Sequence, residues 1–113
     1  MYIAMNRFRV IKGHEADFEQ MWRARESYLP SMRGFVSFHL LRGSTHEDHT
    51  LYSSHTTWRS QEDFETWTKS EGFRRAHANA GDPNRKVLHM GHPQFEGFQA
   101  VLTETMPTRD AAE

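Results

Sequence analysis

The sequence predicts an α+β fold in which helices cover one face of a single antiparallel sheet. Segments with a period of two residues alternate with segments that have helical spacing, and the order strand, helix, strand occurs twice. The chain has 113 residues, which is enough for one core and too few for two. We therefore expect one domain over residues 1–103 and a flexible polar tail over residues 104–113.

The first half of the chain predicts strand, helix and strand. Residues 2–11 have a period of two, which is typical of a strand. Residues 15–29 carry apolar side chains at helical spacing with charges on the opposite side, and Pro30 ends this helix because proline has no N–H. Gly34 then opens a second strand over residues 35–42.

The middle of the chain predicts a third strand and two helical segments. Residues 50–58 are rich in β-branched and aromatic side chains and should form a hairpin with the preceding strand. Ser60 is an expected helix N-cap, and the helix that follows it should turn Phe64 and Trp67 inward. A further helix is expected over residues 70–80.

The end of the chain should close the sheet. Residues 85–93 have no clear period and predict a loop, whereas residues 94–102 alternate and predict the fourth strand. The resulting order, β-α-β-β-α-β, is that of a ferredoxin-like plait. The sheet face without helices carries aromatic side chains, so we expect two sheets to pack face to face as a homodimeric barrel.

Composition excludes several classes of function. Lys and Arg number 14 against 15 Asp and Glu, so there is no basic excess for a nucleic-acid partner. No apolar run is long enough to cross a membrane, and the N-terminal residues show no secretory signal, so we expect a cytoplasmic protein. The absence of cysteine excludes thiolate nucleophiles and Cys-ligated metals. Eight histidines suggest a metal, a haem or acid–base chemistry without choosing among them.

Three residues are candidates for a site, and each has an alternative structural role. His77 lies on the inward stripe of its helix, where it could ligate iron or simply bond to the backbone. Trp67 could wall a cavity or be a core residue. Asn6 lies on an otherwise apolar strand face, so its amide either is paired or faces a ligand.

The remaining basic residues give weaker signals. Arg74 and its neighbours could pair with carboxylates of an anionic ligand or be solvated. His46 and His49 have a spacing of three, not the four of a helical zinc motif, and His89 and His92 fall in the expected loop. His39 and His55 could pair across the hairpin. No glycine-rich phosphate loop and no nucleophile elbow occur.

The residues resemble those of the IsdG-type haem-degrading monooxygenases, within the antibiotic-biosynthesis-monooxygenase superfamily of dimeric ferredoxin-like barrels. Nearly the whole chain is covered, and the segments that carry the resemblance are residues 4–8, 58 and 64–77. Residues 91–98 look most like the HmuQ/HmuD-type bacterial haem oxygenases. The resemblance implies that His77 is the proximal haem ligand, that Asn6 bonds to iron-bound oxygen, and that Trp67 presses on the porphyrin.

The resemblance also implies the reaction. Haem would be both substrate and cofactor, bound with help from Phe73 and Arg74, and residues 81–93 would cover it as a lid. O2 and an external electron donor, supplied by a separate reductase, would open the ring to a biliverdin-type tetrapyrrole with release of iron and carbon monoxide. Two alternatives stay open: a cofactor-free monooxygenase acting on an aromatic or quinol substrate, and a non-catalytic haem carrier.

Overall fold

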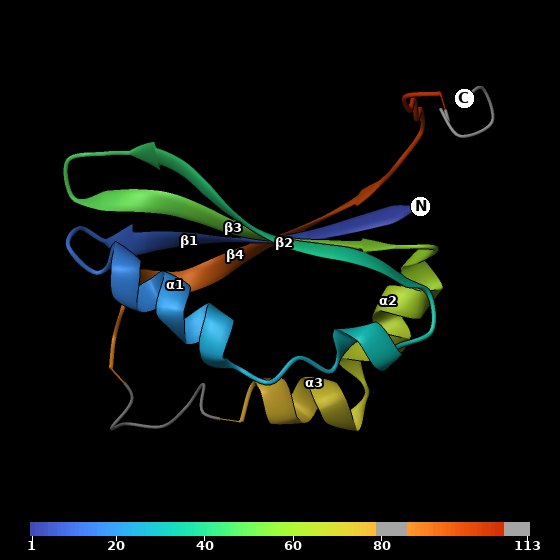
Figure 1. Cartoon of the computed structure of the whole chain (residues 1–113), viewed down its shortest axis with the longest axis horizontal. Helices are drawn as coiled ribbons and strands as arrows, with labels where there is room; N and C mark the ends of the chain where they lie inside the picture. The colour runs from blue at the N-terminus through green and yellow to red at the C-terminus, as the bar shows by residue number, and fades with distance from the viewer. Residues whose placement is uncertain (79–85, 108–113) are drawn as a thin grey trace.

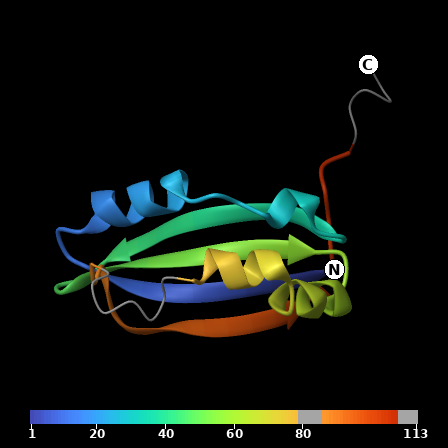
Figure 2. The same ribbon diagram turned by 90° about the horizontal axis from the view of Figure 1, so that it is seen from below.

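A computed structural model describes residues 1–78 and 86–107, and these residues form a four-stranded antiparallel sheet with helices on one side (Figures 1 and 2). The elements follow in the order β1 (Tyr2–Ile11), α1 (Glu15–Ala24), the short 3-10 turn η1 (Leu29–Ser31), β2 (Phe35–Thr45), β3 (His49–Trp58), α2 (Gln61–Thr68), α3 (Glu71–Ala76) and β4 (His89–Gln99). The α+β plait expected from the sequence is confirmed.

The sheet has the strand order β2-β3-β1-β4, so the two central strands are β3 and β1. Its register brings Tyr2 opposite Trp58 and Asn6 opposite Ser54, and on the other side of β1 it brings Asn6 opposite Phe95. Because side chains alternate across a strand, Asn6, Ser54 and Phe95 all face the helices. The helices α1, α2 and α3 lie on this one face, and the opposite face is uncovered (Figure 1).

Ser60 and Ser70 are the N-cap residues of α2 and α3. The Ser60 hydroxyl accepts a hydrogen bond from the Asp63 N–H at 3.1 Å, which confirms the expected N-cap of α2. Ser70 caps α3 in the same way, through the Phe73 N–H at 3.1 Å, and also donates to the Trp67 carbonyl at 2.7 Å. The Ser70 side chain therefore fixes where α2 ends and α3 begins, and with it the positions of Trp67 and Phe73.

The core consists of two clusters on the helix-covered face. One is formed by buried residues beneath α2 and α3, namely Tyr2, Ala4, Leu29, Trp58 and Trp67. The other lies beneath α1 and comprises Phe8, Val10, Phe18, Tyr52 and Leu88. Along β1 the position between Ala4 and Phe8 is Asn6, so the boundary between the clusters is polar.

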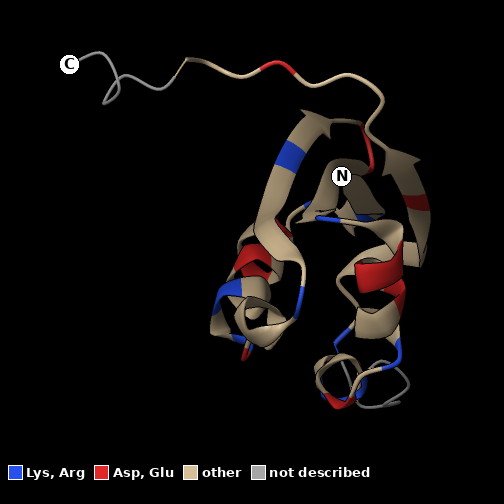
Figure 3. Cartoon of the chain, turned by 90° about the vertical axis from the view of Figure 1, so that its right-hand side faces the viewer, with Lys and Arg blue, Asp and Glu red and all other residues tan. Residues whose placement is uncertain are grey.

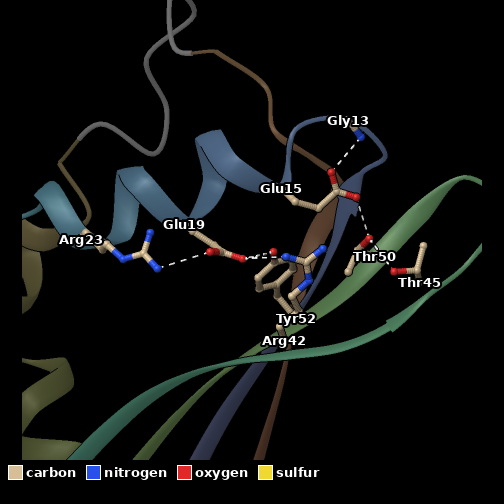
Figure 4. Close-up of polar contacts among 8 residues, drawn as sticks. All are labelled: Gly13, Glu15, Glu19, Arg23, Arg42, Thr45, Thr50 and Tyr52. Atoms are coloured by element: carbon tan, nitrogen blue, oxygen red, sulfur yellow. Dashed lines mark hydrogen bonds and ion pairs between the residues drawn. The ribbon is translucent and has the colours of Figure 1, made fainter.

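Two carboxylates attach α1 to the central strand β3 (Figure 4). Glu15 accepts a hydrogen bond from the Thr50 hydroxyl at 2.7 Å, and Glu19 accepts one from the Tyr52 hydroxyl at 2.5 Å. Arg42 pairs with Glu19 at 3.2 Å. The hydrogen bonds from Thr50 and Tyr52 lower the pKa of Glu15 and of Glu19, while burial and Glu19 raise the pKa of Tyr52 to about 12.

The helix expected over residues 15–29 is shorter than predicted. α1 ends at Ala24, and Arg25 is already extended, with φ −73° and ψ 148°. The apolar pattern continues because Leu29 is buried as part of η1, where Pro30 sits in the first turn. Apolar spacing therefore marked burial correctly but not the end of the helix.

The loop expected over residues 85–93 is also wrong in its second half, since β4 begins at His89. The strand was hidden because its register against β1 shifts between Arg7 and Arg9, which breaks the period of two. β4 ends at Gln99 rather than at residue 102. The following residues 100–107 extend away from the sheet and helices (Figures 1 and 3), and residues 79–85 and 108–113 lie outside the described part.

Candidate functional site: a cavity between the sheet and the helices

A cavity of about 430 Å³ lies on the helix-covered face, where the two core clusters meet. Its lining comes from the sheet, from the end of α1 and from α2 with α3, and comprises Ala4, Asn6, Trp22, Arg25, Leu29, Phe38, Ser54, Thr56, Phe64, Trp67, Thr68, Phe73, His77 and Phe95. This volume is in the ordinary range for small-molecule sites, and the wall is aromatic with a few polar groups, as such sites usually are.

His77 lies at the end of α3 and lines this cavity from its exposed side. It is the C-cap residue, one position beyond the helix in which it was expected. Its Nδ1 is 2.8 Å from the Phe73 carbonyl oxygen, and its ring lies 4.2 Å from the Phe73 ring, centroid to centroid. A carbonyl oxygen only accepts, so Nδ1 carries the proton and Nε2 is the atom with a lone pair. In the neutral imidazole, this is the tautomer that permits a metal bond through Nε2.

Trp67 serves both of the roles considered for it. It is 8% exposed and stacks on Trp58 with ring centroids 6.3 Å apart, so it belongs to the core. It also lines the cavity and meets the edge of Phe73 at 5.5 Å. Gly72 allows this approach, because a Cβ there would lie 2.8 Å from the Cβ of Tyr28 and 3.3 Å from the Trp67 ring. Trp67 is thus a rigid wall supported from behind.

Asn6 lies on the floor of the cavity, half-buried between β3 and β4. Within the described residues its side chain makes no hydrogen bond, although Ser54 opposite it is buried. A half-buried amide without a protein partner favours the second of the two readings considered, in which Asn6 faces a ligand. Its N–H group can donate without bringing a charge into the cavity.

Arg25 is a cavity residue that the sequence reasoning missed. Its guanidinium carbon lies 4.1 Å from the centroid of the Trp22 ring and 5.6 Å from that of Phe38. No carboxylate pairs with it among the described residues, and burial lowers its pKa. A desolvated cation in an aromatic cavity is suited to an anionic group on a ligand. The i, i+3 spacing of Trp22 and Arg25 was the available signal, but nothing local showed that Phe38 would lie beside them.

Trp22 supplies a second unused donor. Its Nε1 is buried and has no hydrogen-bond partner within the described part of the chain. The Trp22 ring stacks on Phe38 with centroids 5.6 Å apart, which holds the indole in the cavity wall.

Arg74 does not have the position expected of a ligand-binding residue. Its guanidinium pairs with Glu71 at 2.7 Å on the surface of α3, and it does not line the cavity. Phe73, by contrast, does line it. The expected lid over residues 81–93 lies partly outside the described residues, and residues 89–93 belong to β4.

None of the other histidines lines this cavity. His39 and His55 face each other across β2 and β3, as expected, with ring centroids 6.1 Å apart. The described residues contain no group of three or more His, Asp or Glu that could hold a metal ion, and none of their helices is long and apolar enough to cross a membrane.

Fold and site together define a ferredoxin-like α+β protein with an aromatic, histidine-bearing cavity beside its sheet. A model of the antibiotic biosynthesis monooxygenase family matches residues 1–79. The chain belongs to this family.

Curated relatives with similar sequences carry names that refer to haem. The chain is 30% identical over 80 residues to a staphylobilin-producing haem oxygenase of Staphylococcus haemolyticus, covering 70% of this chain and 75% of that one. It is 28% identical over 81 residues to a haem-degrading monooxygenase of Bacillus mycoides, covering 72% and 75%.

Solved structures with the same fold include proteins of two kinds. The haem-degrader MhuD of Mycobacterium tuberculosis, with two haems in its active site, matches with a TM-score of 0.70 and 23% identity over 93% of this chain and all of that one. SnoaB of Streptomyces nogalater, a cofactor-independent oxygenase, matches with a TM-score of 0.63 and 21% identity over 95% and 97%. These similarities confirm the fold. The reaction has to be argued from the residues that line the cavity.

Proposed function

We propose that this chain is a haem-degrading monooxygenase that binds haem in the cavity between the sheet and the helices. The observation that carries the proposal is the convergence of Asn6, Trp67 and His77 on one cavity, although they come from β1, α2 and the end of α3. The names of the relatives from Staphylococcus and Bacillus support the same substrate.

The donor set fits haem. The Nε2 of His77 is the available iron ligand, because Nδ1 is held by the Phe73 carbonyl. The aromatic side chains of the lining suit a flat macrocycle, and Trp67 would hold it against a rigid surface. Arg25 lies where a carboxylate of the ligand can pair with it, in the role that the sequence suggested for Arg74.

The iron of bound haem would supply the activation of O2, and the chain's own residues would position the ring and the oxygen. Asn6 would offer a neutral N–H donor from the floor of the cavity, without bringing a charge into it. The core behind Trp67 and Phe38 excludes water from the buried side of the ring. Electrons come from an external donor through a separate reductase, and the products are a biliverdin-type tetrapyrrole, iron and carbon monoxide.

A second copy completes the proposed enzyme. The uncovered sheet face carries Ile3, Met5 and Phe98 at the end near the N-terminus, and Phe98 is 48% exposed. Packing this apolar end against its counterpart would bury it in a homodimeric barrel. We place the reaction in the cytoplasm, where reductases have access to reduced nucleotides.

A cofactor-free monooxygenase of an aromatic or quinol substrate is the second candidate. The unpaired Asn6 amide and the aromatic walls would suit such a substrate as well, and SnoaB has this fold. In that case His77 would have no iron to ligate. A third outcome is a haem carrier that binds without opening the ring.

Titration of the purified chain with haemin tests the proposal. We expect a sharp Soret band that saturates at one haem per chain. A broad band that grows without saturation would contradict haem as the ligand of this cavity and favour the cofactor-free alternative.

A further inference from the structure

A second cavity, of about 180 Å³, lies on the opposite, uncovered face of the sheet. Apart from the apolar Leu51 of β3, its lining is polar: Arg7 and Arg9 of β1, His46 and His49 where β2 turns into β3, and His92 and Gln94 of β4. We call these six polar residues the basic pocket. None of them lines the haem cavity proposed above, and the sequence motifs give their histidines no role.

Two arginines form the floor of the basic pocket. Arg7 and Arg9 are two positions apart on β1, so their side chains leave the same face of the sheet as neighbours. The Nε of Arg7 pairs with Glu96 at 3.1 Å. Arg9 makes no hydrogen bond or ion pair to a carboxylate among the described residues. The Arg7 guanidinium is therefore partly neutralised by a direct ion pair, whereas Arg9 has only the longer-range attraction of Asp48 and keeps its N–H groups available to an anion.

The turn between β2 and β3 forms one wall. The rings of His46 and His49 stack with centroids 4.6 Å apart, and the His46 N–H bonds to the His49 carbonyl at 2.7 Å. Asp48 holds the Nδ1 of His49 at 2.7 Å, and this hydrogen bond lowers the pKa of Asp48. The Asp48 carboxylate is thus hydrogen-bonded to His49, and the charge of Arg9 acts on it from a longer distance.

A bulge in β4 forms the opposite wall. Arg7 pairs with Gln94 and Arg9 with Met90, so three residues of β4 lie opposite the single residue between Arg7 and Arg9. Gly91 has φ +64°, and a Cβ there would lie 3.3 Å from the Nη2 of Arg9. The bulge therefore needs glycine, and it brings His92 and the Arg9 guanidinium into the same pocket. Bulges commonly re-aim side chains in this way.

The donor set of the basic pocket favours an anion. Two guanidinium groups would repel a metal ion, whereas their N–H groups match the geometry of phosphate and carboxylate oxygens. Imidazole and Gln94 side chains add further donors around them. We propose that the basic pocket binds a multiply charged oxyanion of the phosphate or polycarboxylate class, at a site separate from the haem cavity.

Calorimetric titration of the chain with pyrophosphate and with citrate, at ionic strength held constant with sodium chloride, tests the proposal. We expect saturable binding of at least one of them, and the stronger of the two identifies the class. R9Q should weaken it about tenfold, as expected for the loss of a charged hydrogen bond. R59Q changes an exposed arginine outside the basic pocket and should leave binding unchanged.

Absence of saturable heat with both anions, or equal binding by R9Q and the unchanged chain, would overturn the proposal. Circular dichroism establishes that R9Q is folded. Haemin binding by R9Q should equal that of the unchanged chain, because the haem cavity is on the other face of the sheet. Failure of the oxyanion site and failure of the haem proposal therefore give different results.

Discussion

At the scale of single residues, His77 is oriented by the residue one turn before it. Its Nδ1 meets the Phe73 carbonyl at 2.8 Å, and its ring lies against the Phe73 ring. The position of this imidazole is therefore set by α3 and by the Ser70 hydroxyl that caps it. A ligand histidine needs this kind of support, because the bond at Nδ1 decides which nitrogen is available to iron.

We predict that His77→Ala abolishes both the sharp Soret band and haem degradation. The variant removes the only imidazole that lines the proposed haem cavity within the described residues, and His77 lies beyond the last residue of α3. Haemin titration followed by visible spectra measures the effect. His39→Ala, on the uncovered sheet face, is the control and should behave as the unchanged chain. An unaltered Soret band in His77→Ala would exclude His77 as the ligand.

We predict that Arg25 contributes more to haem affinity than Arg74. Arg25 lies unpaired in the cavity, whereas Arg74 pairs with Glu71 outside it. Loss of one charged hydrogen bond corresponds to about a tenfold rise in Kd for Arg25→Gln. Arg74→Gln is the matched control and should change the Kd little. The reverse order in haemin titrations would restore the role first expected for Arg74.

At the scale of the elements, the sequence patterns predicted those ends of strands and helices that short-range features define. β1 has the predicted bounds of residues 2–11, and the Ser60 cap is confirmed. Both depend on short-range features that a sequence displays directly. The N-terminal part of β4 was missed, because its bulge and Gly91 break the period of two on which strand prediction depends.

The residues of the candidate site also fall into those that the sequence indicates and one that it does not. Asn6 was noticeable as a polar residue on an apolar strand face, and the spacing of Trp67 and His77 supported the family resemblance. Arg25 was not predictable, because its place in the cavity depends on α1 ending early and on Phe38 of β2 lying beside it. Contacts between elements that are distant in sequence leave no local pattern.

The attachment of α1 to the sheet should make stability fall in acid. The Tyr52 hydroxyl lowers the pKa of Glu19 in the folded chain. The ionised Glu19 therefore adds to the free energy of unfolding above the ordinary carboxyl range, and this contribution is lost as the pH falls below about 4.3. The raised pKa of Tyr52 has the opposite pH dependence. The protonated Tyr52 adds to the free energy of unfolding below about pH 10, and this contribution is lost as the pH rises toward 12.

Urea unfolding between neutral and acidic pH measures this effect. We predict that Tyr52→Phe lowers the unfolding midpoint at neutral pH and flattens its acid dependence, because Glu19 then loses its main partner. Tyr28→Phe is the control, since Tyr28 bonds to the exposed Glu26 and not to the α1 attachment. An acid dependence as steep in Tyr52→Phe as in the unchanged chain would contradict this account.

At the scale of the whole molecule, the chain leaves one face of its sheet without a layer of helices (Figure 1). The two ends of this face differ. Ile3 pairs with Phe98 at the apolar end, whereas Arg9 pairs with Met90 beside the basic pocket. Ile3 and Arg9 are six positions apart on β1, which corresponds to about 20 Å. A partner and an anion can therefore use different ends of the same face.

We predict that the chain sediments with the mass of two copies. Met5→Asp places a charge in the apolar end of the uncovered face and should shift the mass to that of one copy, because a buried unpaired charge is costly. Met21→Asp is the matched control, since Met21 is an exposed methionine on α1. A dimer in both variants would show that the interface lies on another surface.

The most direct test of the central claim is a single turnover of the haemin complex. The complex is reduced with ascorbate in air, with catalase present to remove free peroxide, and the products are identified by mass spectrometry. We predict a biliverdin-type tetrapyrrole with carbon monoxide, formed at least several-fold more slowly by Asn6→Ala at unchanged haem binding. Recovery of intact haem, or equal rates in the two proteins, would contradict the assignment of this cavity as a haem-degrading site.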